Sequence, residues 1–127
     1  MPPKIDQQTI DTQNLYDGDG DNSEQAVSTS AVDVYHIHVV NKNTADAFLQ
    51  LHDGLAASVT IGTTTPTLSF LVPAAASATQ AGAIDLKFEH APLRFRTGLI
   101  YACTTSESGN TDPTTGLVVN IRHEPPK

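Results

Sequence analysis

The chain has 127 residues, enough for one domain with its own hydrophobic core, and 14 acidic against seven basic residues give it a net charge of −7. This acidity disfavours binding to nucleic-acid phosphates or to anionic membranes, so neither is expected as a partner. A single cysteine, Cys103, excludes an intrachain disulfide. No stretch is apolar enough to span a membrane, and residues 1–6 lack the apolar core of a signal peptide.

Residues 1–31 differ in composition from the rest and are expected to form an acidic arm, extended or disordered. They contain six acidic residues and one lysine, a net charge of −5, and few large apolar residues. Such a segment buries too little apolar surface to offset the entropy lost on ordering. Ile5, Ile10, Leu15 and Tyr16 would then be partner-binding anchors that order only on assembly.

From residue 32 onward, short runs of alternating apolar and polar residues predict β-strands, because one side-chain set faces a core and the other faces water. In the first run, Val34, His36 and His38 are expected on one face, with Tyr35 and Ile37 on the other. Seven strands are expected in all, at residues 32–40, 47–52, 59–61, 68–72, 84–88, 93–95 and 117–121.

The segments between these runs are rich in turn residues. Residues 74–82 are expected to be a surface loop and residues 104–116 a long hairpin loop, while Thr97-Gly98 indicates a bulge or a sharp bend. The sequence therefore predicts an all-β fold, a single antiparallel β-sandwich or jelly-roll over residues 32–127 with the arm in front. Its expected core includes Leu86, Phe88, Phe95, Val119 and Ile121.

Two groups of residues have the composition of a metal site. Asp17, Asp19 and Asp21 alternate with glycine as in a calcium loop, but an EF-hand would need other residues at its sixth and twelfth positions. His36 and His38 form the His-x-His that opens a cupin metal motif, but no glutamate follows at the required spacing. A solvated acidic turn and polar strand residues are the alternative interpretations, and no metal or cofactor is expected.

The sequence offers no recognisable catalytic set. The serines and threonines lie in no G-x-S-x-G motif, and the pair Glu89-His90 is typical of a polar rim at a strand end. Arg94 and Arg96 share a strand face and are interpreted as contacts to a partner or to a carboxylate of the same chain. We therefore expect a protein that is not an enzyme.

Three segments carry a resemblance to a known class of proteins. They are Val34–Asn41 followed by Ala47–Asp53, then Val59–Pro66 with its Gly-Thr-Thr-Thr-Pro, and finally Phe95–Thr105 with its Thr-Gly-Leu. Over roughly residues 32–123 this pattern resembles small β-sandwich virion proteins of tailed bacteriophages, such as capsid decoration proteins. The acidic segment at the N-terminus is not part of the pattern.

The resemblance implies a structural subunit that is made in the host cytoplasm, assembles into the virion and contacts the major capsid protein or other virion proteins, with homo-oligomers expected. Attachment would use the arm and the strand faces. Two alternatives remain open: a neck, tail or surface-binding β-sandwich module, and a metal-dependent cupin-like enzyme.

Overall fold

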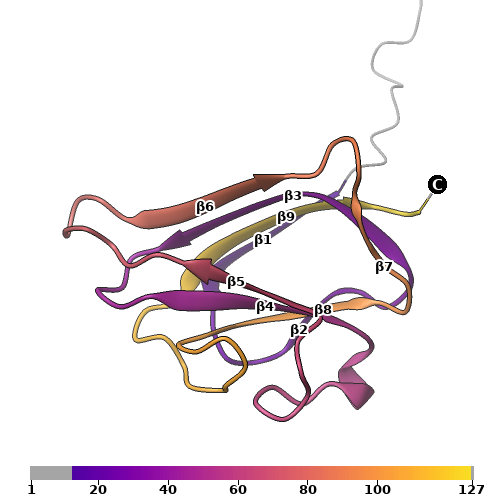
Figure 1. Cartoon of the computed structure of the whole chain (residues 1–127), viewed down its shortest axis with the longest axis horizontal. Coiled ribbons are helices and arrows are strands. Elements are labelled where there is room, and N and C mark those ends of the chain that lie inside the picture. Colours follow the sequence, from indigo (N-terminus) through magenta and orange to yellow (C-terminus); the bar gives the residue numbers. More distant parts are fainter. Residues whose placement is uncertain (1–12, 127) are drawn as a thin grey trace, which may run out of the picture.

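In the computed structural model, which describes residues 13–126, the chain folds into two antiparallel β-sheets that pack face to face (Figure 1). Sheet A has the strand order β1-β9-β3-β6, with β7 also paired to β3, and sheet B has the order β2-β8-β4-β5. The predicted all-β sandwich is therefore confirmed. The strands are β1 (Gln13–Gly20), β2 (Gln25–Ser28), β3 (Val32–Asn41), β4 (Ala47–Asp53), β5 (Leu68–Val72), β6 (Gly82–Lys87), β7 (Leu93–Phe95), β8 (Leu99–Thr104) and β9 (Leu117–Glu124).

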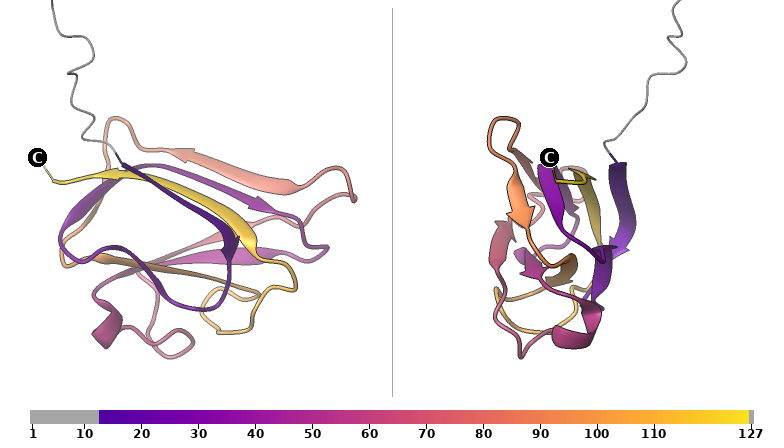
Figure 2. Two further views of the ribbon diagram at one scale, coloured as in Figure 1. Left: turned by 180° about the vertical axis from the view of Figure 1, so that it is seen from behind. Right: turned by 90° about the vertical axis from the view of Figure 1, so that its right-hand side faces the viewer.

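The edge of sheet A beside β3 is one strand in two pieces. β6 pairs with the second half of β3 and β7 with its first half, both antiparallel, and the amide of Phe88 between them donates to the carbonyl of Tyr35 at 2.8 Å. If β6 and β7 are counted as one interrupted strand, each sheet has four strands. Every connection except β4–β5 then crosses from one sheet to the other. This is the arrangement of a jelly roll. Figure 2 shows the two layers from the end of the sandwich.

The space between the sheets is filled by the inward apolar side chains of both. Phe95, Val119 and Ile121 are buried as predicted, while Leu86 and Phe88 are partly buried and pack against this core. Cys103 is also fully buried, and burial, followed by nearby carboxylates, raises the pKa of its thiol. Within the described residues, no helix is long and apolar enough to cross a membrane.

An extra residue in β3 changes which side chains face the core. Val34 pairs with His123 and His36 pairs with Arg122, so β3 advances two residues where β9 advances one. Because of this bulge, Val34 and Ile37 are both fully buried, and His36 lies on the outer side. The predicted grouping of Val34 with His36 and His38 is therefore wrong, since strict alternation does not continue through a bulge.

Two strands come from the segment that its composition assigns to an arm. β1 pairs with β9, with Leu15 opposite Ile121, and β2 pairs with β8, with Ala26 opposite Ile100. Leu15 and Val27 pack against the core. For residues 13–28, the expectation of an arm outside a domain that begins at residue 32 is therefore corrected: these residues complete both sheets. Residues 1–12 lie outside the described part.

The strand predicted at residues 59–61 is wrong as well. A short 3₁₀ helix at Ala56–Ser58 precedes this segment, and a turn follows in which the amides of Thr63 and Thr64 donate to the carbonyl of Thr60. Val59 is nevertheless buried, within a loop that runs beneath sheet B (Figure 1). Its apolar character reflects the packing of a loop.

The predicted bend at Thr97-Gly98 is the point where the chain leaves sheet A for sheet B. A Cβ at Gly98 would lie 2.8 Å from the carbonyl oxygen of Gly54 and 2.9 Å from that of Ser28, so the crossing requires glycine. The Asp53 carboxylate accepts the amides of Arg96 and Thr97 at 3.1 and 2.9 Å. Burial tends to raise the pKa of Asp53, but these backbone hydrogen bonds outweigh it and lower the pKa.

Candidate functional site

The acidic turn at the end of β1 uses its carboxylates to hold its own conformation. Asp17 accepts the amide of Asp19 at 3.0 Å and the hydroxyl of Tyr101 at 2.6 Å, and Asp21 accepts the amide of Ser23 at 2.9 Å. Among residues 13–126, no three or more His, Cys, Asp or Glu side chains lie close enough together to hold a metal ion. The three aspartates therefore do not converge on one point in this structure.

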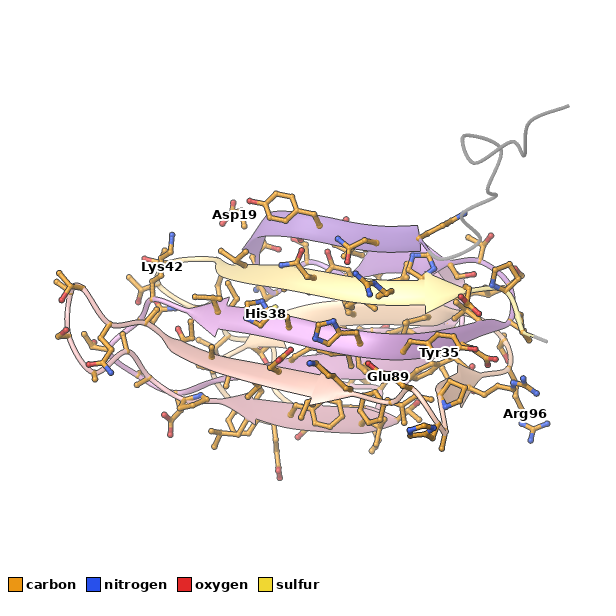
Figure 3. All side chains as sticks on the ribbon, turned by 90° about the horizontal axis from the view of Figure 1, so that it is seen from above. Asp19, Tyr35, His38, Lys42, Glu89 and Arg96 are labelled. Atoms are coloured by element: carbon orange, nitrogen blue, oxygen red, sulfur yellow. The ribbon has the colours of Figure 1, made fainter. Side chains whose placement is uncertain are left out.

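His36 and His38 lie on the solvent side of β3, two strands away from β1, whereas Asp17 points to the other side of the sheet. His36 Nε2 pairs with Asp85 Oδ1 on β6, and this hydrogen bond lowers the pKa of the Asp85 carboxyl. His38 stands directly opposite Asp85 on one side and Asn120 on the other. The two histidines are therefore part of a broad strand face, which Figure 3 shows from above with His38 near its centre.

This surface is the outer face of sheet A, formed by the outward side chains of four adjacent strands. Strand register arranges them in rows that cross the sheet. One row has Asn14, Arg122, His36 and Lys87 on β1, β9, β3 and β6, the next has Tyr16, Asn120, His38 and Asp85, and a third has Val118, Val40 and Ala83. The alternate residues of the same strands point into the core, and the face therefore has two polar rows and one apolar row.

Of the predicted anchors, the structure separates Leu15 from Tyr16. Leu15 packs against the core, whereas Tyr16 is 68% exposed on the outer face of sheet A. A Cβ at Gly18 would lie 2.8 Å from the Tyr16 hydroxyl oxygen, so the ring extends along β1 over that glycine. Tyr16 therefore presents an exposed aromatic side chain at the edge of the face. Ile5 and Ile10 lie outside the described residues.

The two predicted arginines differ in their contacts. Arg94 donates to both carboxylate oxygens of Asp33, from Nε at 2.8 Å and from Nη2 at 3.0 Å. This bidentate pair holds the buried Asp33 and raises the pKa of Arg94. Arg96 is exposed, and Figure 3 shows it at the periphery of the molecule. Arg94 thus makes the expected contact to a carboxylate of the same chain, while its side chain stays 46% exposed, and Arg96 is exposed to a partner.

The centre of the outer face of sheet B is covered, while Leu71 on the edge strand β5 is 47% exposed. Gln50 and His52 alternate with the core residues Leu49 and Leu51 and so point away from the interior, yet both are almost fully buried. Gln50 Nε2 donates to the Thr104 hydroxyl at 2.8 Å and to the carbonyl of Gly109 at 2.9 Å, which fastens the loop after β8 to this face. Figure 1 shows this loop and the loop after β4 beneath sheet B.

Beneath this cover, only one of the two ring nitrogens of His52 has a hydrogen-bond partner among the described residues. Its Nε2 lies 3.0 Å from Gln50 Oε1, an acceptor, so Nε2 carries the proton and Nδ1 is left unprotonated. No hydrogen-bond partner for Nδ1 exists among the described residues, and burial lowers the pKa of His52. This histidine is therefore neutral in the folded protein, and protonating it would bring a charge into a covered site.

A pocket of about 240 Å³ opens between the β3–β4 loop and the β8–β9 loop. Its shape depends on Asn43, whose side chain bonds both the amide and the carbonyl of Thr115, at 2.7 and 2.8 Å. Asn41 braces Asn43 through its own Oδ1. Lys42 and Asp46 supply charge at the rim. The sequence did not predict this pocket, because the pocket forms between two loops that are distant in sequence.

A scan against models of protein families and a search of curated proteins found no match to this chain.

Proposed function

We propose that the chain is a non-enzymatic structural protein of a tailed-phage virion, a capsid decoration subunit that attaches through the outer face of sheet A. The observation that carries this proposal is the difference between the two outer faces of the sandwich. Loops cover the centre of sheet B, with Gln50 and His52 buried and only the edge residue Leu71 well exposed, whereas sheet A offers an open, mostly polar face with Tyr16 exposed at its edge. Tyrosine is enriched in protein–protein interfaces.

The resemblance to small phage virion proteins supports the same proposal. Its Thr97-Gly98-Leu99 falls on the crossing between sheets, and Gly62, in its Gly-Thr-Thr-Thr-Pro, adopts a φ of +93° in the loop beneath sheet B. These positions of the resemblance belong to the scaffold and not to the open face. The partners proposed are the major capsid protein and further copies of this chain.

Copy number in purified particles tests this function. Quantitative mass spectrometry of virions from the phage that encodes the chain should find it in a fixed ratio to the major capsid protein, because a decoration subunit repeats with the lattice. Cross-linking should join Lys87 on the open face to the capsid protein. Complete particles without the chain, or cross-links through the loops beneath sheet B alone, would reject the proposal.

The pocket beside Asn43 favours a second candidate, a neck, tail or surface-binding module. Ligand sites are concave and combine apolar walls with a few fixed polar groups, and about 240 Å³ suits a small group. In that case the copy number would be far below that of the capsid protein. Asn43→Ala, which removes both contacts to Thr115, would then abolish attachment, whereas a decoration subunit that docks through sheet A would retain it.

A further inference from the structure

The outer face of sheet A carries a charge pattern that the stability of the fold does not explain. Arg122, His36 and Lys87 occupy directly opposed positions on the neighbouring strands β9, β3 and β6. Arg122 and Lys87 stand two strands apart on either side of His36, and neither forms an ion pair with a residue between 13 and 126. Cations that find no carboxylate partner within the fold make this row a candidate contact surface.

Carboxylates lie on both sides of this row: the exposed Asp85 on one side, and on the other Glu124 opposite Asp33, both of which are buried. Asp85 lies in the next row and pairs with His36. Arg122 and Lys87 form no ion pair with any residue between 13 and 126, and both are exposed. A surface with two unpaired cations and two histidines is an exception in a chain with twice as many acidic as basic residues.

We propose that this row, Arg122–His36–Lys87, docks against an acidic patch on the surface of a neighbouring protein. This inference rests on the proposed function, in which that neighbour is the capsid protein, and it specifies the chemistry of the contact. Acidic groups on the partner would give Arg122 and Lys87 the ion pairs that they lack within the described residues, and would guide the encounter. Tyr16, two strands away from His36 on the same face, adds an aromatic contact beside the charged centre.

The face fits a protein surface better than a nucleic acid. Duplex DNA carries closely spaced phosphates, and its binding proteins neutralise several of them with Lys and Arg. Only Arg122 and Lys87 are permanent cations in the three rows, Asp85 lies among them, and the whole chain has a net charge of −7. A flat sheet with two cations and an exposed tyrosine matches the polar and aromatic composition of protein interfaces.

The first experiment uses the free protein and an oligo-glutamate peptide as the acidic probe, with NMR shifts and microscale thermophoresis as readouts. At low salt the wild type should bind the peptide, and the NMR signals of His36 and its neighbours should shift on binding. Binding should weaken as salt is added. The double variant R122E/K87E should bind at least about tenfold more weakly.

A control variant adds negative charge elsewhere. Thr63 and Thr65 are exposed in the loop beneath sheet B, and T63E/T65E lowers the net charge by two, as the neutral variant R122Q/K87Q does. T63E/T65E should bind the peptide nearly as well as the wild type, whereas R122Q/K87Q should fall between the wild type and R122E/K87E. Equal losses in T63E/T65E and R122Q/K87Q, or no loss in R122E/K87E, would overturn the assignment of the row. R122Q/K87Q also guards against misfolding of R122E/K87E, and thermal melting checks all three.

The second experiment adds the same proteins to particles that lack the chain and counts bound copies. Full occupancy by T63E/T65E and reduced occupancy by R122E/K87E is the expected result. If the wild type binds the peptide through the row but not the particles, the proposed function fails while the acidic-partner inference stands. If the wild type and R122E/K87E fill particles equally, the function stands and the inference fails. Tighter binding to a DNA duplex than to oligo-glutamate would also overturn it.

Discussion

Replacing Tyr101 by phenylalanine tests whether β1 is an integral strand of the sandwich. The Tyr101 ring is 2% exposed in sheet B, and its hydroxyl donates to Asp17 on β1 of sheet A at 2.6 Å. Burial, reinforced by the Asp17 carboxylate, raises the pKa of this hydroxyl, so it remains a donor at all physiological pH values. The contact joins the two sheets through the segment whose composition suggested a separate arm.

The expected loss follows from the kind of hydrogen bond. Bonds to a charged group stabilise folded proteins by about 1.5–3 kcal/mol. Asp17 is half-buried and retains the amide of Asp19, so water can replace part of what is lost, and we expect about 1.5–2 kcal/mol. Urea unfolding followed by circular dichroism and tyrosine fluorescence measures this loss. Tyr16→Phe, the same chemical change on a side chain that is 68% exposed, should change stability by less than about 0.5 kcal/mol.

A double-mutant cycle isolates the contact itself. Asp17→Ala leaves the buried Tyr101 hydroxyl without its acceptor, so it should cost about 1–3 kcal/mol, and the double variant should cost less than the sum of the two. A coupling near zero, together with a Tyr101→Phe effect no larger than that of Tyr16→Phe, would refute the reasoning. It would mean that β1 does not stay on sheet A in solution.

Three further measurements examine the core, a backbone crossing and a buried histidine. Phe95→Ala should reduce the free energy of unfolding by about 3–5 kcal/mol because it leaves a cavity in the core, and a loss below about 1 kcal/mol would place the ring on the surface. Gly98→Ala should cost about 1–3 kcal/mol because its Cβ meets two backbone carbonyls, and an unchanged melting temperature would contradict that packing. Burial lowers the pKa of His52 below its ordinary 6.5, so just below that pH the unfolded chain binds more protons than the folded one. Stability should therefore fall as pH drops below about 6.5, with His52→Gln reducing the slope in urea titrations; His123, whose pKa burial also lowers, contributes with the same sign.

The alternation of apolar and polar residues was sufficient to predict most of the sandwich. The runs that end in Phe95 and Ile121 bury the predicted side chains, because each strand has one face on a single core. β1 escaped prediction because it contributes little to that core: Leu15 is its one apolar anchor, and Asp17 points inward to a hydrogen bond. Val59 gave the opposite error, a strand predicted where none forms. Its apolar side chain is buried in a loop that packs under sheet B.

The candidate site could not be predicted, because the sequence alone does not give the register of the strands. Arg122, His36 and Lys87 come from three separated segments, and only strand register shows that they stand in one row. The bulge at Tyr35 shifted the expected faces as well, and no glycine or other local signal in β3 announces it. The histidines and arginines were singled out as residue types, but their neighbours were not predictable.

The pairing of β1 with β9 has a consequence for how the chain can be rewired. Gln13 stands directly opposite His123, so the two ends of the described chain are neighbours, as Figure 2 shows from behind. A short linker from Pro126 to Gln13 would close the backbone into a ring, and new ends can be opened in the exposed turn at Ser77–Gln80 at the far end of the sandwich. Such a circular permutant would keep every strand pair of the described residues and carry a fused tag or cargo at the end of the sandwich opposite to residues 13 and 126.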